Sequence, residues 1–150
     1  MTLTDHLARL AMETPADALT PAARQAARTM TLDSLACALG GSRQPGVRET
    51  LDCFAEWGGA PQATVLFHGR KLPLPQAACA NSVQVHALDF DDLYQPGILH
   101  VCSVVFPCAL STAEYVDATT EDFLAAFALG VEVACRLGRA SRSRRQGVGW

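Results

Sequence analysis

Two histidines and three aspartates occur together in one short stretch, HALDFDDLYQPGILH (residues 86–100), of a chain otherwise rich in alanine, leucine and valine. Imidazole and carboxylate groups are the side chains that most often remove a proton from a substrate and return one. One Asp and one His that face the same carbon atom are the smallest set able to do both. The stretch is therefore a candidate proton-transfer site, with Asp89 and His100 as its candidate residues.

The geometry of this candidate site depends on where the preceding helix ends. If a helix that begins near Pro75 continues to about Asp92, His86, Asp89 and Asp92 recur at i, i+3 and i+6 and share one face, whereas Asp91 points elsewhere. His100 follows Pro96-Gly97, a pair typical of a turn. A turn there would fold His100 back toward Asp89.

Two other interpretations of the stretch compete with acid–base catalysis. In the first, the aspartates are solvated at a helix end and His100 caps the next helix. In the second, the carboxylates and imidazoles bind Mg²⁺, Mn²⁺ or Zn²⁺. The segment DDLYQ approaches the D-D-x-x-D pattern of all-helical isoprenoid synthases, but residue 95 is Gln, so the outer carboxylate is missing. Spacing alone leaves all three interpretations open.

The 150-residue chain has the size and composition of one globular, helix-rich domain. Hydrophobic residues make up 49% and charged residues 18%, which argues against disorder. No apolar run approaches the length of a membrane span, and the first helical segment carries charged residues, so we expect a cytoplasmic protein that binds no membrane. The arginines of residues 136–150 are expected to end a helix and enter a solvated loop, without binding nucleic acid. The six cysteines form no C-x-x-C pair and are expected to be reduced thiols.

Helix punctuation predicts an all-α layout with one short β-hairpin near residues 63–72. Thr20 and Pro21 suit the N-cap and N1 positions of a helix that Gly40-Gly41 ends, and this helix should be largely buried. A helix from about residue 47 should stop at Gly58-Gly59. A helix over about residues 104–115 should hold Pro107 in its first turn, because a proline further inside would break a backbone hydrogen bond. Thr119 and Asp122 resemble a capping box at the start of a last helix, which then meets Gly138.

Several stretches together resemble the MmgE/PrpD family, which includes 2-methylcitrate dehydratase, cis-aconitate decarboxylase and iminodisuccinate epimerase. The resemblance is carried by ANSVQVHALDFDDLY, the later His100, VVFPCALSTAEY and ALGVEVACRLGRA. Weaker likeness extends upstream through ARQAARTMTLDSLACALGG and ATVLFHGRKLPLPQAACAN. The H-A-L-D-F-D-D and G-V-E-V-A-C-R-L-G blocks make a specific pair, so the resemblance covers nearly the whole chain.

The resemblance implies a large helical domain, of which residues 1–150 are the N-terminal portion, and a homodimeric enzyme without a bound cofactor and generally without metal. It implies a lyase (dehydratase or decarboxylase) or epimerase that moves a proton next to a carboxylate of a small di- or tricarboxylate. Carried over by position, Asp89 and His100 match catalytic-site residues. His86, Asp92 and Leu93 are expected to line the substrate pocket. Leu93 departs from the family, which commonly has Thr there, and Val101-Cys102 stands where Pro and a small residue are common.

The family's chains are longer than this one and continue into a smaller α/β lid domain, which these residues do not include. A second active-site histidine and the basic residues of the lid are also expected beyond residue 150. We therefore expect a chain of this length to be an N-terminal fragment and inactive by itself. Two alternatives stay open: a non-catalytic helical module that oligomerises through its apolar faces, and a helical enzyme that uses a divalent metal.

Overall fold

The computed structural model describes residues 2–144, with side chains placed as far as residue 141. The predicted all-α architecture with one β-hairpin is confirmed. A short 3₁₀ turn, Ala16–Ala18, links the first two helices. The helices and strands are α1 (Leu3–Glu13), α2 (Pro21–Gly41), α3 (Val47–Trp57), β1 (Ala63–Val65), β2 (Arg70–Leu72), α4 (Leu74–His86), α5 (Val101–Val116) and α6 (Thr120–Arg144).

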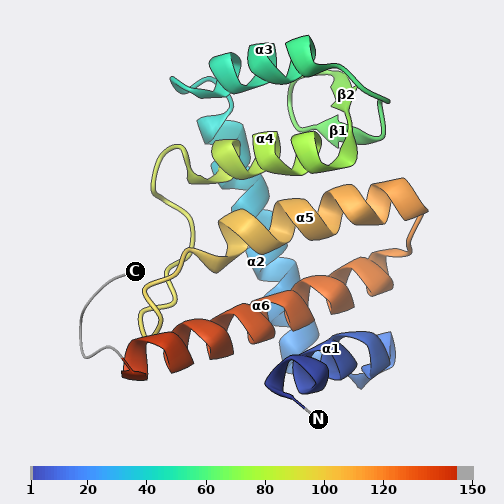
Figure 1. The fold of residues 1–150 in the computed structure, drawn as a ribbon, viewed down its shortest axis with the longest axis vertical. Helices are drawn as coiled ribbons and strands as arrows, with labels where there is room; N and C mark the ends of the chain where they lie inside the picture. Colours follow the sequence, from blue (N-terminus) through green and yellow to red (C-terminus); the bar gives the residue numbers. More distant parts are fainter. Residues whose placement is uncertain (1, 145–150) are drawn as a thin grey trace.

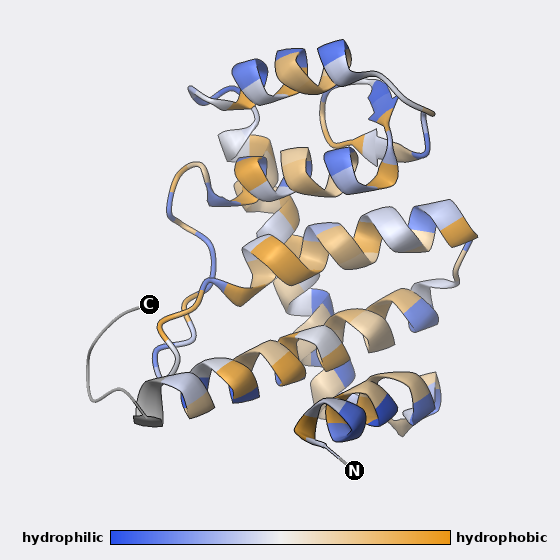
Figure 2. Ribbon diagram, in the orientation of Figure 1, coloured by the Kyte–Doolittle hydropathy of each residue, from blue (hydrophilic) through white to orange (hydrophobic). Residues whose placement is uncertain are grey.

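Helices α4, α5 and α6 lie side by side and form one layer, which α2 crosses from behind (Figure 1). The main hydrophobic core fills the space between these four helices and includes Ala38, Val85, Phe106, Leu124 and Phe127. Helix α3 and the hairpin pack on α4 around a second cluster. Helix α5, in the middle of the layer, is apolar along most of its length, whereas α1 and α3 carry hydrophilic turns (Figure 2).

Local capping follows the sequence prediction closely. The Thr20 hydroxyl accepts a hydrogen bond from the backbone N–H of Ala23, and Pro21 is the first residue of α2. Gly58 ends α3. Thr119 and Asp122 exchange hydrogen bonds between side chain and backbone, which makes the predicted capping box at the start of α6. Each of these signals depends on neighbours in sequence, which explains why the sequence alone sufficed.

The prediction that the helix over residues 21–41 is largely buried was wrong. Only Ala27, Ser34, Cys37, Ala38 and Gly41 of this helix are buried, and Leu32 and Leu39 are exposed. Helix α2 crosses the layer from one side only, so its other face has no helix of the described chain against it (Figure 1).

Pro107 lies in the second turn of α5, not in the first turn as predicted, because the helix begins earlier, at Val101. A proline at this position cannot donate to the carbonyl of Ser103 one turn earlier. The Ser82 hydroxyl of α4 donates to that carbonyl at 2.6 Å instead. A neighbouring helix thus supplies the hydrogen bond that the proline removes.

The hairpin is held against α4 and α5 by polar side chains. Ala63, Thr64 and Val65 pair antiparallel with Leu72, Lys71 and Arg70. Asn81 of α4 accepts a hydrogen bond from the N–H of Leu66 and donates to the carbonyl of Thr64. Glu114 of α5 accepts from the N–H and the hydroxyl of Thr64, each at 2.7 Å, and pairs with Lys71 at 2.8 Å. These contacts fix the hairpin relative to the middle of α4 and the C-terminal end of α5.

None of the helices described in residues 2–144 is both long and apolar enough to span a membrane. The six cysteines are all free thiols. Residues 145–150 of the arginine-rich tail lie outside the described residues.

Candidate active site

Helix α4 ends at His86, six residues earlier than the prediction required, so His86, Asp89 and Asp92 do not share a helix face. Asp89 instead adopts a left-handed conformation, with φ of 54°, and its N–H donates to the carbonyl of His86. Aspartate tolerates this conformation better than most residues do. The chain then turns sharply and leaves the helix axis, which brings the following residues back under the end of α4.

The predicted return of His100 toward Asp89 is confirmed. Tyr94 and Leu99 pair through two backbone hydrogen bonds and close a tight loop that contains Pro96-Gly97. The Nε2 atom of His100 lies 3.5 Å from Oδ1 of Asp89.

Gly138 of α6 supports this loop, which corrects the expectation that it would stop the helix. A Cβ atom on Gly138 would lie 2.2 Å from Cδ1 of Leu99 and 3.5 Å from Cα of Gly97. The helix continues through Gly138 to Arg144. The residue is therefore needed for close approach of the loop to α6, not for ending a helix.

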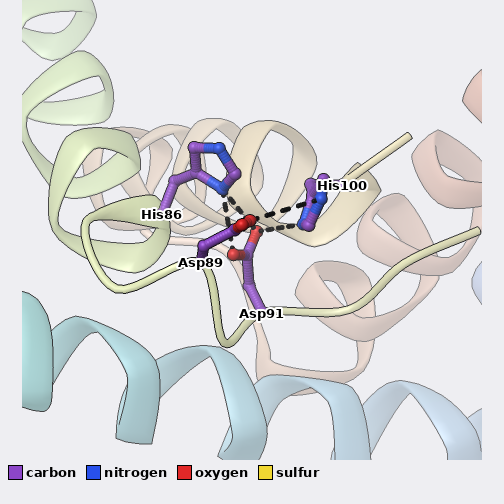
Figure 3. A group of neighbouring side chains, drawn as sticks. All are labelled: His86, Asp89, Asp91 and His100. Carbon is purple, nitrogen blue, oxygen red and sulfur yellow. Dashed lines mark hydrogen bonds and ion pairs between the residues drawn. The ribbon is translucent and has the colours of Figure 1, made fainter. Parts of the chain in front are cut away.

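The centre of the group is Asp91, which the sequence prediction had pointing elsewhere. Its side chain is 1% exposed, and its Oδ1 and Oδ2 lie 2.9 and 3.2 Å from Nδ1 of His86. Its Oδ2 also lies 3.4 Å from Nδ1 of His100. Figure 3 shows the Asp91 carboxylate between the two imidazole rings, with Asp89 beside it. Because the backbone after His86 is not helical, the alternate residues Asp89 and Asp91 lie on the same side. The D-x-D spacing in the sequence is consistent with this arrangement, but a continuous helix was assumed there instead.

The two histidines contact each other as well as the aspartates. Their ring centroids are 4.7 Å apart in an edge-to-face arrangement. The Asp89 side chain is 77% exposed, that of His86 is 50% exposed and that of His100 is 29% exposed. The group therefore has a buried carboxylate, that of Asp91, at its bottom and a solvent-accessible side formed by Asp89 and the two rings.

Two further predicted site residues lie next to this group in different roles. Asp92 accepts a hydrogen bond from the N–H of Cys102 at 2.8 Å, so it provides an acceptor for a backbone N–H in the first turn of α5. His100 occupies the N-cap position of α5, but its side chain makes no capping hydrogen bond. Leu93 is exposed. The structure thus brings together His86, Asp89 and His100, while Asp92 turns toward the helix.

The same four side chains have the donor atoms of a metal site. One ligand-type atom from each of His86, Asp89, Asp91 and His100 lies within 4.8 Å of the other three. Imidazole nitrogens and carboxylate oxygens are suitable ligands for Zn²⁺ or Mn²⁺. The arrangement is thus compatible with two uses, proton transfer and ion binding.

Burial controls the reactivity of a thiol next to the group. Cys102 is 1% exposed, and desolvation, followed by the charge of Asp92, raises the pKa of its thiol far above the ordinary value. A thiol is a nucleophile only when it is ionised. We therefore assign Cys102 to the core and not to chemistry.

Comparisons with known proteins point to one family. The family model of the MmgE/PrpD N-terminal domain matches residues 5–150. The cis-aconitate decarboxylase-like protein oryM of Aspergillus oryzae is 29% identical over 133 residues, which are 84% of this chain and 27% of that protein. Cis-aconitate decarboxylase of Aspergillus terreus is 28% identical over 119 residues, 76% of this chain and 24% of that protein. Human cis-aconitate decarboxylase is 37% identical over 71 residues, 45% of this chain and 15% of that protein. The chain spans about a quarter of the length of the two fungal relatives.

Proposed function

Because this chain belongs to the MmgE/PrpD family, we propose that it is the N-terminal part of a lyase or epimerase that acts on a small di- or tricarboxylate by metal-independent proton transfer. The observation that carries the proposal is the contact between Asp89 and His100. Nε2 of His100 faces an exposed carboxylate at 3.5 Å, so a substrate carbon can reach both groups at once.

The pair supplies an acid and a base on one side of a substrate carbon. In a decarboxylation, the bond from carbon to the leaving carboxylate breaks, its electrons stay on the carbon framework, and an acid returns a proton to carbon as CO₂ departs. In a dehydration, a base takes the proton from carbon and an acid gives one to the departing hydroxyl. In an epimerisation, the proton leaves one face of the carbon and another arrives on the opposite face, so a further acid outside this contacting pair would have to lie there. With one proton between them, the protonated member of the Asp89–His100 pair acts as the acid and the other member acts as the base.

The names of the relatives favour cis-aconitate as the first substrate to test, because the two fungal proteins and the human protein are all cis-aconitate decarboxylases or decarboxylase-like. 2-Methylcitrate, a substrate class implied by the family resemblance, comes second. The exposed Leu93 and the half-exposed His86 would line the same pocket and select among these acids.

The proposal also requires cations from elsewhere. The ion pairs of Asp89, Asp91 and the two histidines are with one another, so within residues 2–141 this group offers a polycarboxylate no fixed positive charge. A substrate with two or three carboxylates needs basic partners. We propose that they come from other parts of the complete enzyme or from a second subunit of a homodimer, and light scattering of the native protein would test the dimer.

A panel of turnover assays tests the proposed function. The native protein that contains this chain is incubated with cis-aconitate, 2-methylcitrate and iminodisuccinate, and CO₂ release, water loss and change of configuration are followed. We expect turnover of one acid, and loss of that turnover in Asp89→Asn and in His100→Ala with helical circular dichroism unchanged. His6→Ala is the matched control, because His6 is exposed in α1, away from the site. Wild-type turnover in either site variant would contradict the role assigned to that residue.

A second candidate function, a divalent metal site, is supported by the four donor atoms within 4.8 Å. Metal analysis of the purified protein distinguishes the two candidates. Stoichiometric Zn²⁺ or Mn²⁺ that is lost in Asp91→Asn, and a melting temperature that falls with EDTA, would favour the metal site. A metal-free protein whose melting temperature ignores both ion and chelator would favour proton transfer.

A further inference from the structure

Asp91 is the one acidic residue in the described part of the chain that is buried. A carboxylate removed from water is costly unless it accepts hydrogen bonds or pairs with a positive group. The partners available to Asp91 are Nδ1 of His86, at 2.9 Å, and Nδ1 of His100, at 3.4 Å. Both contacts are to an Nδ1 atom, so one carboxylate lies against the Nδ1 edge of both histidine rings (Figure 3).

The environment of His100 strengthens this interpretation. Its Nδ1 atom is shielded from solvent and has no hydrogen-bond partner within residues 2–141, although Asp91 Oδ2 is close. Its other nitrogen, Nε2, faces the exposed Asp89. The two ring nitrogens therefore face different surroundings, one closed and one open. Which nitrogen carries the proton is decided by the group that its opposite nitrogen contacts.

We infer that Asp91 is a positioning residue: its buried carboxylate accepts the Nδ1–H of His86 and faces Nδ1 of His100 at ion-pair distance, and so leaves Nε2 of His100 free to exchange a proton with Asp89 or with a substrate. A carboxylate behind an imidazole fixes its tautomer and orientation and stabilises the imidazolium when Nε2 takes up a proton. The assignment of Nε2 to proton exchange rests on the proposed function. The expected position of the proton on each neutral ring does not, because it follows from the contacts of Asp91 alone.

Nitrogen NMR of the histidine side chains tests the tautomers directly in the native protein that contains this chain. Neutral histidine in water favours the proton on Nε2, and the exposed His6 should show this default. We expect His86 and His100 to carry the proton on Nδ1 instead. This measurement needs only the wild-type chain, so it does not depend on a variant that folds. Protonation of Nε2 in either His86 or His100 would overturn the inference for that histidine.

Two isosteric variants show which carboxylate is responsible. Asp91→Asn has only one acceptor oxygen, so at least one of the two histidines should revert to the Nε2–H form. Asp89→Asn, the matched control, faces Nε2 and should leave both Nδ1 protons in place. The opposite result, with a change in Asp89→Asn and none in Asp91→Asn, would overturn the inference.

Kinetics of the native enzyme add a readout that distinguishes positioning from a failure of the proposed function. Asp91→Asn should lower kcat at least about tenfold and leave KM within about twofold, because the residue touches no substrate. Asp91→Glu, which keeps the carboxylate, should recover part of that loss. If Asp91→Asn keeps the wild-type kcat while Asp89→Asn is inactive, the positioning role fails and the proposed function stands. If Asp89→Asn is active as well, the proposed function fails, and the NMR result still decides the tautomers.

Discussion

Oδ1 of Asp92 accepts the backbone N–H of Cys102 at 2.8 Å, so a residue in the middle of the acidic stretch closes the first turn of the next helix. The orphan N–H groups at a helix start need such acceptors. The contact gives Asp92 a structural role in addition to the pocket-lining role expected from the family resemblance. It also fixes His100, which immediately precedes α5.

Replacement of Asp92 separates these two roles. Asp92→Ala should lower the free energy of unfolding by about 1 kcal/mol, because the capping acceptor is lost, whereas Asp92→Asn keeps an acceptor and should stay within about 0.5 kcal/mol of wild type. Urea unfolding followed by circular dichroism measures both. Equal stability of the Ala variant and the wild type would show that the contact does not support the helix.

Gly41 lies where α2 and α4 approach each other closely. A Cβ atom there would lie 1.9 Å from the carbonyl oxygen of Gln84, whereas a Cβ on the neighbouring Gly40 would meet only the Leu88 side chain at 3.2 Å. Gly41→Ala should therefore destabilise the fold by about 2 kcal/mol or more, and Gly40→Ala, the matched control, should change stability by less than about 1 kcal/mol. Thermal unfolding of the two variants checks the difference, and a Gly41→Ala protein as stable as Gly40→Ala would refute the helix contact.

The bond from Ser82 to the Ser103 carbonyl exists because Pro107 cannot supply one. Ser82→Ala should cost about 1–3 kcal/mol, the penalty for a buried carbonyl left without a donor. In a Pro107→Ala background, the new N–H can donate to the same carbonyl, so Ser82→Ala should cost less there. A double-mutant cycle measured by urea unfolding gives the coupling. An equal cost of Ser82→Ala in both backgrounds would contradict this account of α5.

The anchor of the hairpin should depend on pH. Burial alone raises the pKa of Glu114, but hydrogen bonds from Lys71 and Thr64 outweigh it, so the pKa lies below its ordinary value of 4.5. A carboxyl group with a depressed pKa in the folded state stabilises the fold above its unfolded pKa and loses that contribution as pH falls through the folded pKa. Glu114→Gln should therefore cost about 1–2 kcal/mol at neutral pH and progressively less below about pH 4.

Glu132→Gln is the matched control for this prediction. Glu132 pairs with Arg136 at 2.6 Å on an exposed face of α6, where an ion pair adds little stability. Its substitution should change stability by less than about 0.5 kcal/mol at either pH. A cost of Glu114→Gln that stays constant from neutral to acidic pH would rule out the charged anchor.

Sequence patterns predicted the elements whose ends are set by neighbouring residues. Thr20-Pro21, Gly58 and the Thr119–Asp122 box each act within one helical turn, so no knowledge of the tertiary structure was needed. The same reasoning failed at Pro107 and at Gly138. At Pro107 a serine on another helix replaces the missing hydrogen bond, and at Gly138 the glycine serves a contact with Leu99. Both depend on packing partners that are distant in the sequence.

In the candidate site, too, some features could be predicted from neighbouring residues and others could not. The return of His100 toward Asp89 was predictable, because Pro96-Gly97 indicates a turn. The central position of Asp91 was not, because it depends on the left-handed conformation of Asp89, which ends α4 early. With a regular helix through residue 92, Asp91 would face away from both histidines. One backbone conformation therefore decides which carboxylate is buried between the rings.

Incorporation of solvent deuterium is the most direct test of the claim that Asp89 and His100 move a proton at a substrate carbon. The native protein is incubated in D₂O with the acid that it turns over, and mass spectrometry follows deuterium on carbon in the product and the recovered substrate. We expect incorporation by wild type and by His6→Ala, and its loss, by about a hundredfold or more, in Asp89→Asn and in His100→Ala. Incorporation at the wild-type rate in either site variant would show that the residue does not move the proton.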